Sequence, residues 1–374
     1  MEIKRKSFMR LAFYLILLIP AVVQAFVTWR CWQLMPFPVW GRAVVALLMW
    51  VCFALFFLAL MPKLDTLPYA ASTLIYNVGT SWVIIMFYLF LLFVVLSLLQ
   101  GFHLMPRELM KNSLEGTLFV TVLMVAVFVY GYHHYTDKHR ESLALLTDKT
   151  VMQPGKLFRI IMTSDWHLGY HNRRTELARW IDMLNAENPD IILVAGDIID
   201  RSLRPLEEEK MYEEFRRLKC PIVACLGNHE YFAGERSSQH FYEAAGIRLL
   251  RDDVMEWGPL CIIGRDDRTN DQRAPLAELM RRANNRKYTI LLDHQPYHLE
   301  EAEQANIDFQ FSGHTHYGQV WPASWITDAL YECAFGSHQR GDTQYYVSSG
   351  LGIWGGKFRI GTRSEYVVAD LNVR

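Results

Sequence analysis

The sequence shows no excess of either charge and no cysteine pattern typical of a metal site or a disulfide framework. Its 374 residues contain 38 Lys and Arg against 39 Asp and Glu, which gives a net charge of −1. Proteins that bind nucleic acid usually present a strongly basic surface, so we expect no nucleic-acid partner. None of the six cysteines forms a Cys-x-x-Cys pair, which indicates free thiols in a reducing compartment.

The sequence does contain several long apolar stretches in its N-terminal part. Hydrophobic residues make up 51% of the chain and aromatic residues 13%. A helix needs about 20 apolar residues to cross a bilayer. Four stretches meet this length, and the second and third contain no charged residue. They cover roughly residues 8–27, 43–61, 82–99 and 114–132. We therefore expect a transmembrane region of four helices, with the lipid bilayer as a partner.

The first stretch has a second interpretation. Lys4, Arg5 and Lys6 precede the apolar run, and Val-Gln-Ala stands at residues 23–25, as in a secretory signal peptide with a cleavage site. A run of about 20 residues is long for a signal core. Because three more spans follow directly, the sequence favours a span over a cleaved signal.

Basic residues beside the spans predict which side of the membrane the C-terminal half occupies. One side collects eight Lys and Arg, and the other side collects four, which are Arg30, Arg42, Arg107 and Lys111. The side with more basic residues is normally cytoplasmic. We therefore expect a multi-pass protein of a bacterial inner membrane with a cytoplasmic C-terminal half.

From about residue 157 the pattern changes to short β-branched runs that alternate with amphipathic helical stretches, which is typical of an α/β fold. Helices are expected over residues 174–186 and 206–218. Strands are expected over residues 157–163, 191–194, 222–225, 261–263, 288–292 and 309–311.

Polar fragments directly follow five of these strands. Side chains at the carboxyl ends of adjacent strands converge on one crevice, where open α/β sheets usually bind ligands. Glycine beside such a side chain lets the backbone turn sharply. The fragments are Asp165-Trp166-His167, Gly196-Asp197-Ile198-Ile199-Asp200, Gly227-Asn228-His229-Glu230, Asp293-His294 and Gly313-His314-Thr315-His316.

The residue types in these fragments indicate a metal centre. Asp, Asn and His together form a mixed oxygen and nitrogen ligand set, which suits Mn, Fe, Co or Zn better than the all-oxygen cage of calcium. No cysteine is included, which argues against a structural zinc site. A nearby run, residues 265–268, either lines the rim of the same crevice or forms a solvated loop.

The order Asp-x-His, Gly-Asp-x-x-Asp, Gly-Asn-His-Glu, His and Gly-His-x-His resembles the calcineurin-like metallophosphoesterase superfamily. The resemblance covers about residues 157–370, and every signature position is filled. Residues 313–319 and 349–352 are similar to the membrane-associated bacterial phosphodiesterase branch, in which glycine is common at the position of Tyr317.

The resemblance implies a fold and a division of the chain. The fold is α/β, a four-layer sandwich of two mixed β-sheets flanked by helices, preceded here by the four-helix transmembrane region. We expect a membrane anchor over residues 1–135, a polar linker over residues 136–156 and a catalytic domain over residues 157–374.

Carried onto this sequence, the resemblance also implies two divalent metal ions, manganese among the candidates, with Asp197 as the bridge. It implies that His229 is catalytic and faces the phosphoryl oxygens and the leaving group, and that Asp200 and Glu230 orient the ligands. The remaining metal ligands would be Asp165, His167 and His316 for one ion, and Asn228, His294 and His314 for the other.

The expected function is hydrolysis of a phosphodiester or pyrophosphate bond by a metal-bridging hydroxide. The anchor makes a lipid-linked phosphoester one candidate substrate. One alternative is a phosphatase or phosphodiesterase for soluble phosphoesters, which the anchor only localises. Another is a non-catalytic membrane scaffold, although such proteins usually lose ligands, and here none is missing.

Overall fold

The computed structural model describes residues 2–149 and 157–373, and the chain divides into two compact units, Met1–Tyr130 and Gly131–Arg374. The described part of the first unit consists of helices joined by short loops. Its elements are α1 (Glu2–Leu34), α2 (Val39–Leu60), η1 (Pro62–Thr66), α3 (Tyr69–Gly101), η2 (Arg107–Met110) and most of α4 (Leu114–Thr136). The last six residues of α4, residues 131–136, belong to the second unit.

Three of the described helices, α2, α3 and α4, are long and apolar enough to cross a membrane. They confirm three of the four predicted spans. The first predicted span, residues 8–27, lies within α1, but the side chains of residues 2–17 lie outside the described residues. The structure therefore supports three spans where four were predicted, and the first one stays a prediction.

The apolar side chains of these helices face largely outward. Between 17% and 22% of the residues in the apolar window of each helix are buried. Large side chains such as Leu47, Leu98 and Val122 are more than half exposed. Soluble proteins rarely expose continuous apolar surface of this extent, whereas a lipid environment favours it.

The second unit contains two six-stranded mixed sheets. The first has the order β1-β12-β2-β3-β4-β5 and the second the order β10-β11-β9-β8-β7-β6. The strands of the first sheet are β1 (Lys138–Thr147), β12 (Ser364–Val373), β2 (Phe158–Thr163), β3 (Ile191–Ala195), β4 (Ile222–Cys225) and β5 (Arg248–Leu249). Those of the second are β10 (Gly336–Arg340), β11 (Thr343–Val347), β9 (Phe309–Ser312), β8 (Tyr288–Leu292), β7 (Leu260–Gly264) and β6 (Asp253–Trp257).

Alternating side chains of the strands build a four-layer sandwich. Successive residues of a strand face opposite sides of the sheet. Ile160 accordingly joins a core shared by both sheets, while Ile161 packs with helices α5 (Arg174–Ala186) and α9 (Glu235–Ala245). On the outer side of the second sheet, Leu291 packs with α10 (Leu276–Arg282) and α11 (Glu300–Gln304). The predicted sandwich of two mixed sheets flanked by helices is confirmed.

Parallel pairing brings the polar fragments to one edge of each sheet. Strands β2, β3 and β4 run parallel to one another, as do β7, β8 and β9. The loops after β2, β3, β4, β8 and β9 therefore leave from carboxyl ends, as the sequence predicted.

One predicted helix is divided. Residues 206–218 form two short helices, α6 (Arg204–Glu208) and α7 (Tyr212–Phe215), in place of one. Between them Lys210 has a φ of 51°, a left-handed conformation that ends a right-handed helix.

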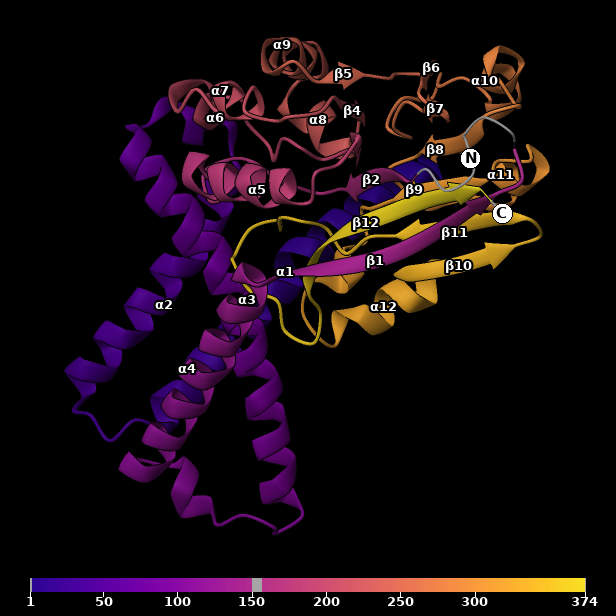
Figure 1. The fold of residues 1–374 in the computed structure, drawn as a ribbon. Coiled ribbons are helices and arrows are strands. Elements are labelled where there is room, and N and C mark those ends of the chain that lie inside the picture. The colour runs from indigo at the N-terminus through magenta and orange to yellow at the C-terminus, as the bar shows by residue number, and fades with distance from the viewer. Residues whose placement is uncertain (1, 150–156, 374) are drawn as a thin grey trace. The chain divides into compact units, whose positions relative to one another are not determined.

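The stretch predicted as a linker, residues 136–156, contains strand β1. This strand pairs in parallel with the C-terminal strand β12 over its whole length, from Lys138 opposite Ser364 to Thr147 opposite Val373. Figure 1 shows the two strands side by side. Leu145 is fully buried in the core between the sheets. Residues 138–147 are therefore part of the catalytic fold, and residues 150–156 lie outside the described ones.

A pair of neighbouring substitutions tests the packing of β1. Leu145 is fully buried, whereas Leu146 is 48% exposed. We expect Leu145→Ala to lower the free energy of unfolding of the catalytic unit by about 2–4 kcal/mol, because the lost contacts leave a cavity. Leu146→Ala should change it by less than about 1 kcal/mol. Thermal unfolding of the full-length variants in detergent measures both, and equal small effects would restore the linker interpretation.

Candidate metal centre

The residues predicted as metal ligands all lie in the segments that directly follow β2, β3, β4, β8 and β9; Asn228 begins helix α8 (Asn228–Ala233), and His316 begins the 3-10 helix η3 (His316–Gly318). Five of these seven residues have a left-handed backbone, with φ between 45° and 69°: Asp165, His167, Asp197, His314 and His316. Such conformations are unfavourable for residues with a Cβ and cluster at functional sites. The unfavourable backbone conformations of these residues therefore determine the directions of their side chains.

Glycine permits the close approach of these loops. A Cβ at Gly227 would overlap Oδ1 of Asp197, and a Cβ at Gly313 would overlap Oδ2 of Asp165. The Gly-Asn-His-Glu and Gly-His-x-His fragments thus need glycine because a neighbouring carboxylate occupies the space.

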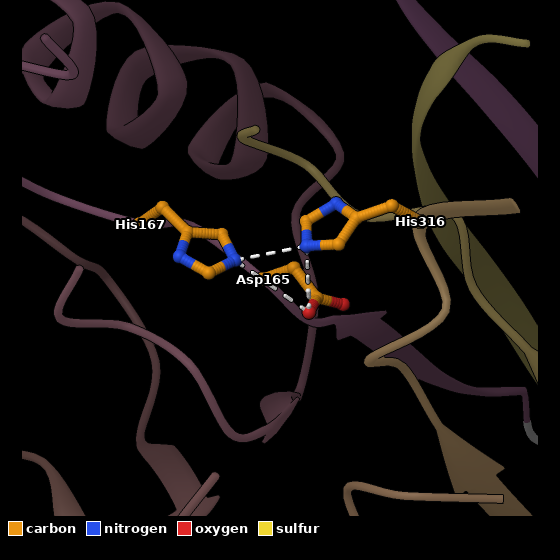
Figure 2. A group of neighbouring side chains, drawn as sticks. All are labelled: Asp165, His167 and His316. Carbon is orange, nitrogen blue, oxygen red and sulfur yellow. Dashed lines mark hydrogen bonds and ion pairs between the residues drawn. The ribbon is translucent and has the colours of Figure 1, made fainter. Parts of the chain in front are cut away.

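Asp165, His167 and His316 form a first group of converging ligand atoms (Figure 2). Nε2 of His167 lies 3.0 Å from Nε2 of His316. Oδ1 of Asp165 lies 3.4 Å from the His316 nitrogen and 3.8 Å from the His167 nitrogen. Two imidazole nitrogens and one carboxylate oxygen directed at one point form a donor set that could hold a divalent transition metal.

Asp197, His294 and His314 form a second such group, which Asn228 joins. Nε2 of His294 lies 3.1 Å from Oδ2 of Asp197 and 3.2 Å from Oδ1 of Asn228, whose oxygen is 2.9 Å from Nδ1 of His314. Oδ2 of Asp197 also lies 3.7 Å from Nε2 of His167, in the first group. The carboxylate of Asp197 therefore stands between the two groups.

Burial and the nearby carboxylates separate the pKa values of the four histidines. Burial opposes a charge on His167, but the carboxylates of Asp165 and Asp200 outweigh it and raise its pKa to about 10. Burial likewise opposes a charge on His294, and Asp197 raises its pKa well above the ordinary value. Burial, together with the charge of His294, lowers the pKa of His314 to about 4, and burial also lowers the pKa of His316. Burial and the carboxylates thus act in opposite directions on these rings, and the carboxylates prevail only at His167 and His294.

His229 lies at the opening of the site. Its side chain is 14% exposed, its backbone N–H donates to Oδ1 of Asp197 over 2.9 Å, and its Nδ1 contacts the backbone carbonyl of Asp200. A carbonyl only accepts, so Nδ1 carries a proton. A cavity of about 240 Å³ is lined by His229 together with Asp197, Asn228, His314, His316 and Trp354, among others.

Asp200 and Glu230 support the ligand loops from behind. Oδ1 of Asp200 lies 3.4 Å from Nδ1 of His167, which turns the Nε2 atom of that ring toward Asp165. The carboxylate of Glu230 accepts from the backbone N–H groups of Gly227, Asp197 and Ile199 over 2.7, 3.1 and 3.0 Å. Burial and the charge of Asp197 raise the pKa of Glu230 to about 7. Glu230 thus ties the loop after β3 to the loop after β4.

Residues 265–268 do not form a solvated loop. Asp266 and Asp267 are each 1% exposed, and Arg265 is 5% exposed. Arg265 pairs with Asp293 over 3.2 Å, directly before His294. Nδ1 of His294 lies 2.7 Å from the carbonyl of Ala195, so its Nε2 faces the other ligands. This run therefore supports the His294 loop.

Sequence reasoning missed Arg359, which is fully buried behind the first group. Its guanidinium donates to the carbonyl of His316 over 2.7 Å, to that of Gly352 over 3.1 Å and to that of Ser349. Nothing local identifies it, because backbone carbonyls carry no sequence signature. Its fixed fork of donors holds the loop that carries His316.

Tyr317 occupies a position at which the membrane-associated bacterial phosphodiesterase branch is expected to have glycine. The backbone conformation at Tyr317 is one that favours glycine. Its φ is 48°, which glycine adopts without strain. In this chain the tyrosine ring stacks on Phe335, with ring centroids 4.9 Å apart.

The two-sheet sandwich gathers Asp, Asn and His donors that could hold metal ions at the carboxyl ends of its strands, and comparisons with known proteins agree with the predicted metallophosphoesterase class. The family profile of the calcineurin-like phosphoesterases matches residues 158–318. An uncharacterized metallophosphoesterase of Campylobacter jejuni is 31% identical over 272 residues, which cover 71% of this chain and 72% of the relative. An uncharacterized metallophosphoesterase of Aquifex aeolicus is 28% identical over 67% of this chain and 98% of its own length.

A third relative includes the helical region. A transmembrane protein with a metallophosphoesterase domain from Danio rerio is 24% identical over 361 residues, which cover 90% of this chain and 79% of the relative. Taken with the site, these matches show that the chain belongs to the calcineurin-like phosphoesterase family.

Proposed function

We propose that this protein is a membrane-anchored phosphoesterase with two divalent metal ions, which hydrolyses a phosphodiester or pyrophosphate bond. The observation that carries the proposal is the position of Asp197, whose Oδ2 faces His294 of one ligand group and His167 of the other. A carboxylate placed in this way suits a bridge between two cations.

The donor atoms fit such a centre. Asp165, His167, His316 and Asp197 would hold one ion, and Asn228, His294, His314 and Asp197 the other. The donors are oxygen and nitrogen without sulfur, which suits Mn, Fe, Zn or Co. Behind them, Asp200 and Glu230 would fix the rings and loops.

Two divalent cations, when bound, supply a nucleophile at neutral pH and neutralise charge on the phosphoryl oxygens. The chain itself supplies His229. With Nδ1–H directed at the carbonyl of Asp200, its Nε2 is available to the cavity. A second proton there would let His229 donate to the oxygen of the leaving group as the ester bond breaks.

We further propose that the first unit anchors the enzyme in a bacterial inner membrane, with the catalytic unit on the cytoplasmic side. The outward-facing apolar helices and the eight-to-four distribution of basic residues support this arrangement. Such an anchor would keep the cavity close to phosphate esters carried by lipids.

A substrate screen tests the function. Full-length protein loaded with Mn²⁺ would be offered monoesters, diesters and pyrophosphates, each in a water-soluble and a lipid-linked form, with a chelator-treated sample as control. We expect hydrolysis of diesters or pyrophosphates that depends on metal. Turnover of soluble aryl diesters without turnover of lipid-linked substrates would favour the soluble alternative. A fully folded protein that binds no metal would favour a scaffold.

A further inference from the structure

A short helix beside the metal centre exposes an apolar face. Helix α12 (Ala323–Leu330) places Trp325, Ile326 and Leu330 on one side, and each of them is more than 60% exposed. Trp321, just before the helix, is 45% exposed, and its ring meets that of Trp325 edge to face with centroids 5.3 Å apart. We call these four residues the α12 face. On the opposite side of the helix, Ser324 is buried against the domain.

The α12 face is fixed to the end of an apolar helix. The backbone N–H of Trp321 donates to the carbonyl of Ile360 over 2.7 Å, and that of Arg359 donates to the carbonyl of Gly131, in the last turns of α4, over 2.9 Å. A Cβ on Gly131 would meet the side chain of Ile360. One loop therefore touches both the end of α4 and the start of the α12 face.

Within the second unit, this contact joins the α12 face to residues 131–136, the C-terminal end of α4. Helix α4 is long and apolar enough to span a bilayer and ends at Thr136. The end of a spanning helix lies in the headgroup region. Tryptophan is enriched at that level, and short amphipathic helices lie flat in it with their apolar side toward the acyl chains.

The same face also borders the proposed catalytic cavity. Gly318 and Gln319 line that cavity, and the amide of Gln319 donates to the carbonyl of Trp354 over 3.0 Å. Only Val320 separates Gln319 from Trp321. Phe232 is 66% exposed, and its ring centroid lies 5.3 Å from that of His229, which lines the cavity. Exposed apolar side chains therefore lie next to residues that line a cavity containing charged groups.

We infer that the α12 face inserts into the headgroup region of the bilayer that the apolar helices cross, so that the cavity opens toward phosphate esters borne by lipids. This inference deepens the proposed function and rests on it for the substrate, but not for the membrane contact. The bilayer is the occupant to expect, because a chain anchored beside it meets its surface at a high effective concentration.

Photolabelling tests the membrane contact without reference to activity. A benzophenone amino acid would replace Trp325 in full-length protein embedded in lipid nanodiscs. In a matched control it would replace Trp257, which is 39% exposed and pairs with Leu260 at the amino end of β7, away from the site. After illumination, mass spectrometry should find about tenfold more lipid adduct at position 325 than at position 257. Equal labelling, or adducts at position 325 with another protein or another part of this chain, would overturn the inference.

A double variant, Trp325→Ser with Ile326→Ser, tests the consequence for substrate. Turnover of a lipid-borne phosphate diester in nanodiscs should fall by about tenfold, while metal content and turnover of a water-soluble diester stay at wild-type levels. An equal fall for both substrates would contradict a role in membrane docking. If the unaltered protein hydrolyses neither substrate, the proposed function fails, and the photolabelling result still decides whether the α12 face meets lipid.

Discussion

Replacing Asp197 with asparagine is expected to lower both bound metal and turnover together. The substitution keeps the size of the side chain but removes the charge that stands between the two ligand groups. We expect fewer than two metal ions per chain and a fall in kcat of at least about a thousandfold, which corresponds to about 4 kcal/mol of lost transition-state stabilisation. Elemental analysis of the purified protein and steady-state kinetics with a phosphodiester measure the two effects.

The matched control for this substitution is Asp370→Asn. Asp370 pairs with Arg159 over 2.8 Å, and both side chains are 29% exposed, so the change removes a similar charge away from the cavity. Exposed ion pairs contribute little to stability, so metal content and turnover should stay near wild type. If Asp197→Asn retained two metal ions and full turnover, the bridging role and the mechanism built on it would both be wrong.

Arg359→Met is expected to have the largest effect on stability. The guanidinium is fully buried and donates to the carbonyls of His316, Ser349 and Gly352. Methionine would fill much of the space but leave three carbonyls without their donor. At about 1–1.5 kcal/mol for each carbonyl, the free energy of unfolding of the catalytic unit should fall by about 3–5 kcal/mol. The loop that carries His316 should loosen, so metal affinity should fall as well.

The control for Arg359→Met is Arg159→Met, which breaks the exposed pair with Asp370 and should cost less than about 1 kcal/mol. Thermal unfolding and metal titration of both variants in detergent provide the comparison. A stable Arg359→Met protein with unchanged metal affinity would show that the His316 loop keeps its shape without the arginine.

The convergence of these side chains could be predicted from the sequence because its signals are local. Each fragment such as Gly227-Asn228-His229-Glu230 joins a glycine, a candidate ligand and the end of a buried strand within a few residues. The order of the strands then brings the fragments together without further information. What the ligand atoms hold, and what His229 does, remain predictions that the expected metal and kinetic measurements address.

The features that the sequence did not reveal depend on distant partners. In β1 only a few side chains, such as Leu145, face the core. Because most of the other side chains of this edge strand are polar or exposed, its sequence resembles that of a polar linker. Arg359 binds carbonyls of residues as far away in sequence as His316. The left-handed turn at Lys210, which divides the expected helix, has no glycine to mark it. In each case the partner or the turn, and not the residue type, decides the structure.

The parallel pairing of β1 with β12 also constrains how the enzyme is made. β1 leaves the ribosome directly after helix α4, but its neighbour in the sheet, β12, follows all the other described strands in the sequence. Until β12 has been synthesised, both edges of β1 are unpaired, and such edges are prone to incorrect pairing. Charged residues such as Lys138, Arg140 and Glu141 on this strand would discourage incorrect pairing until β12 is available.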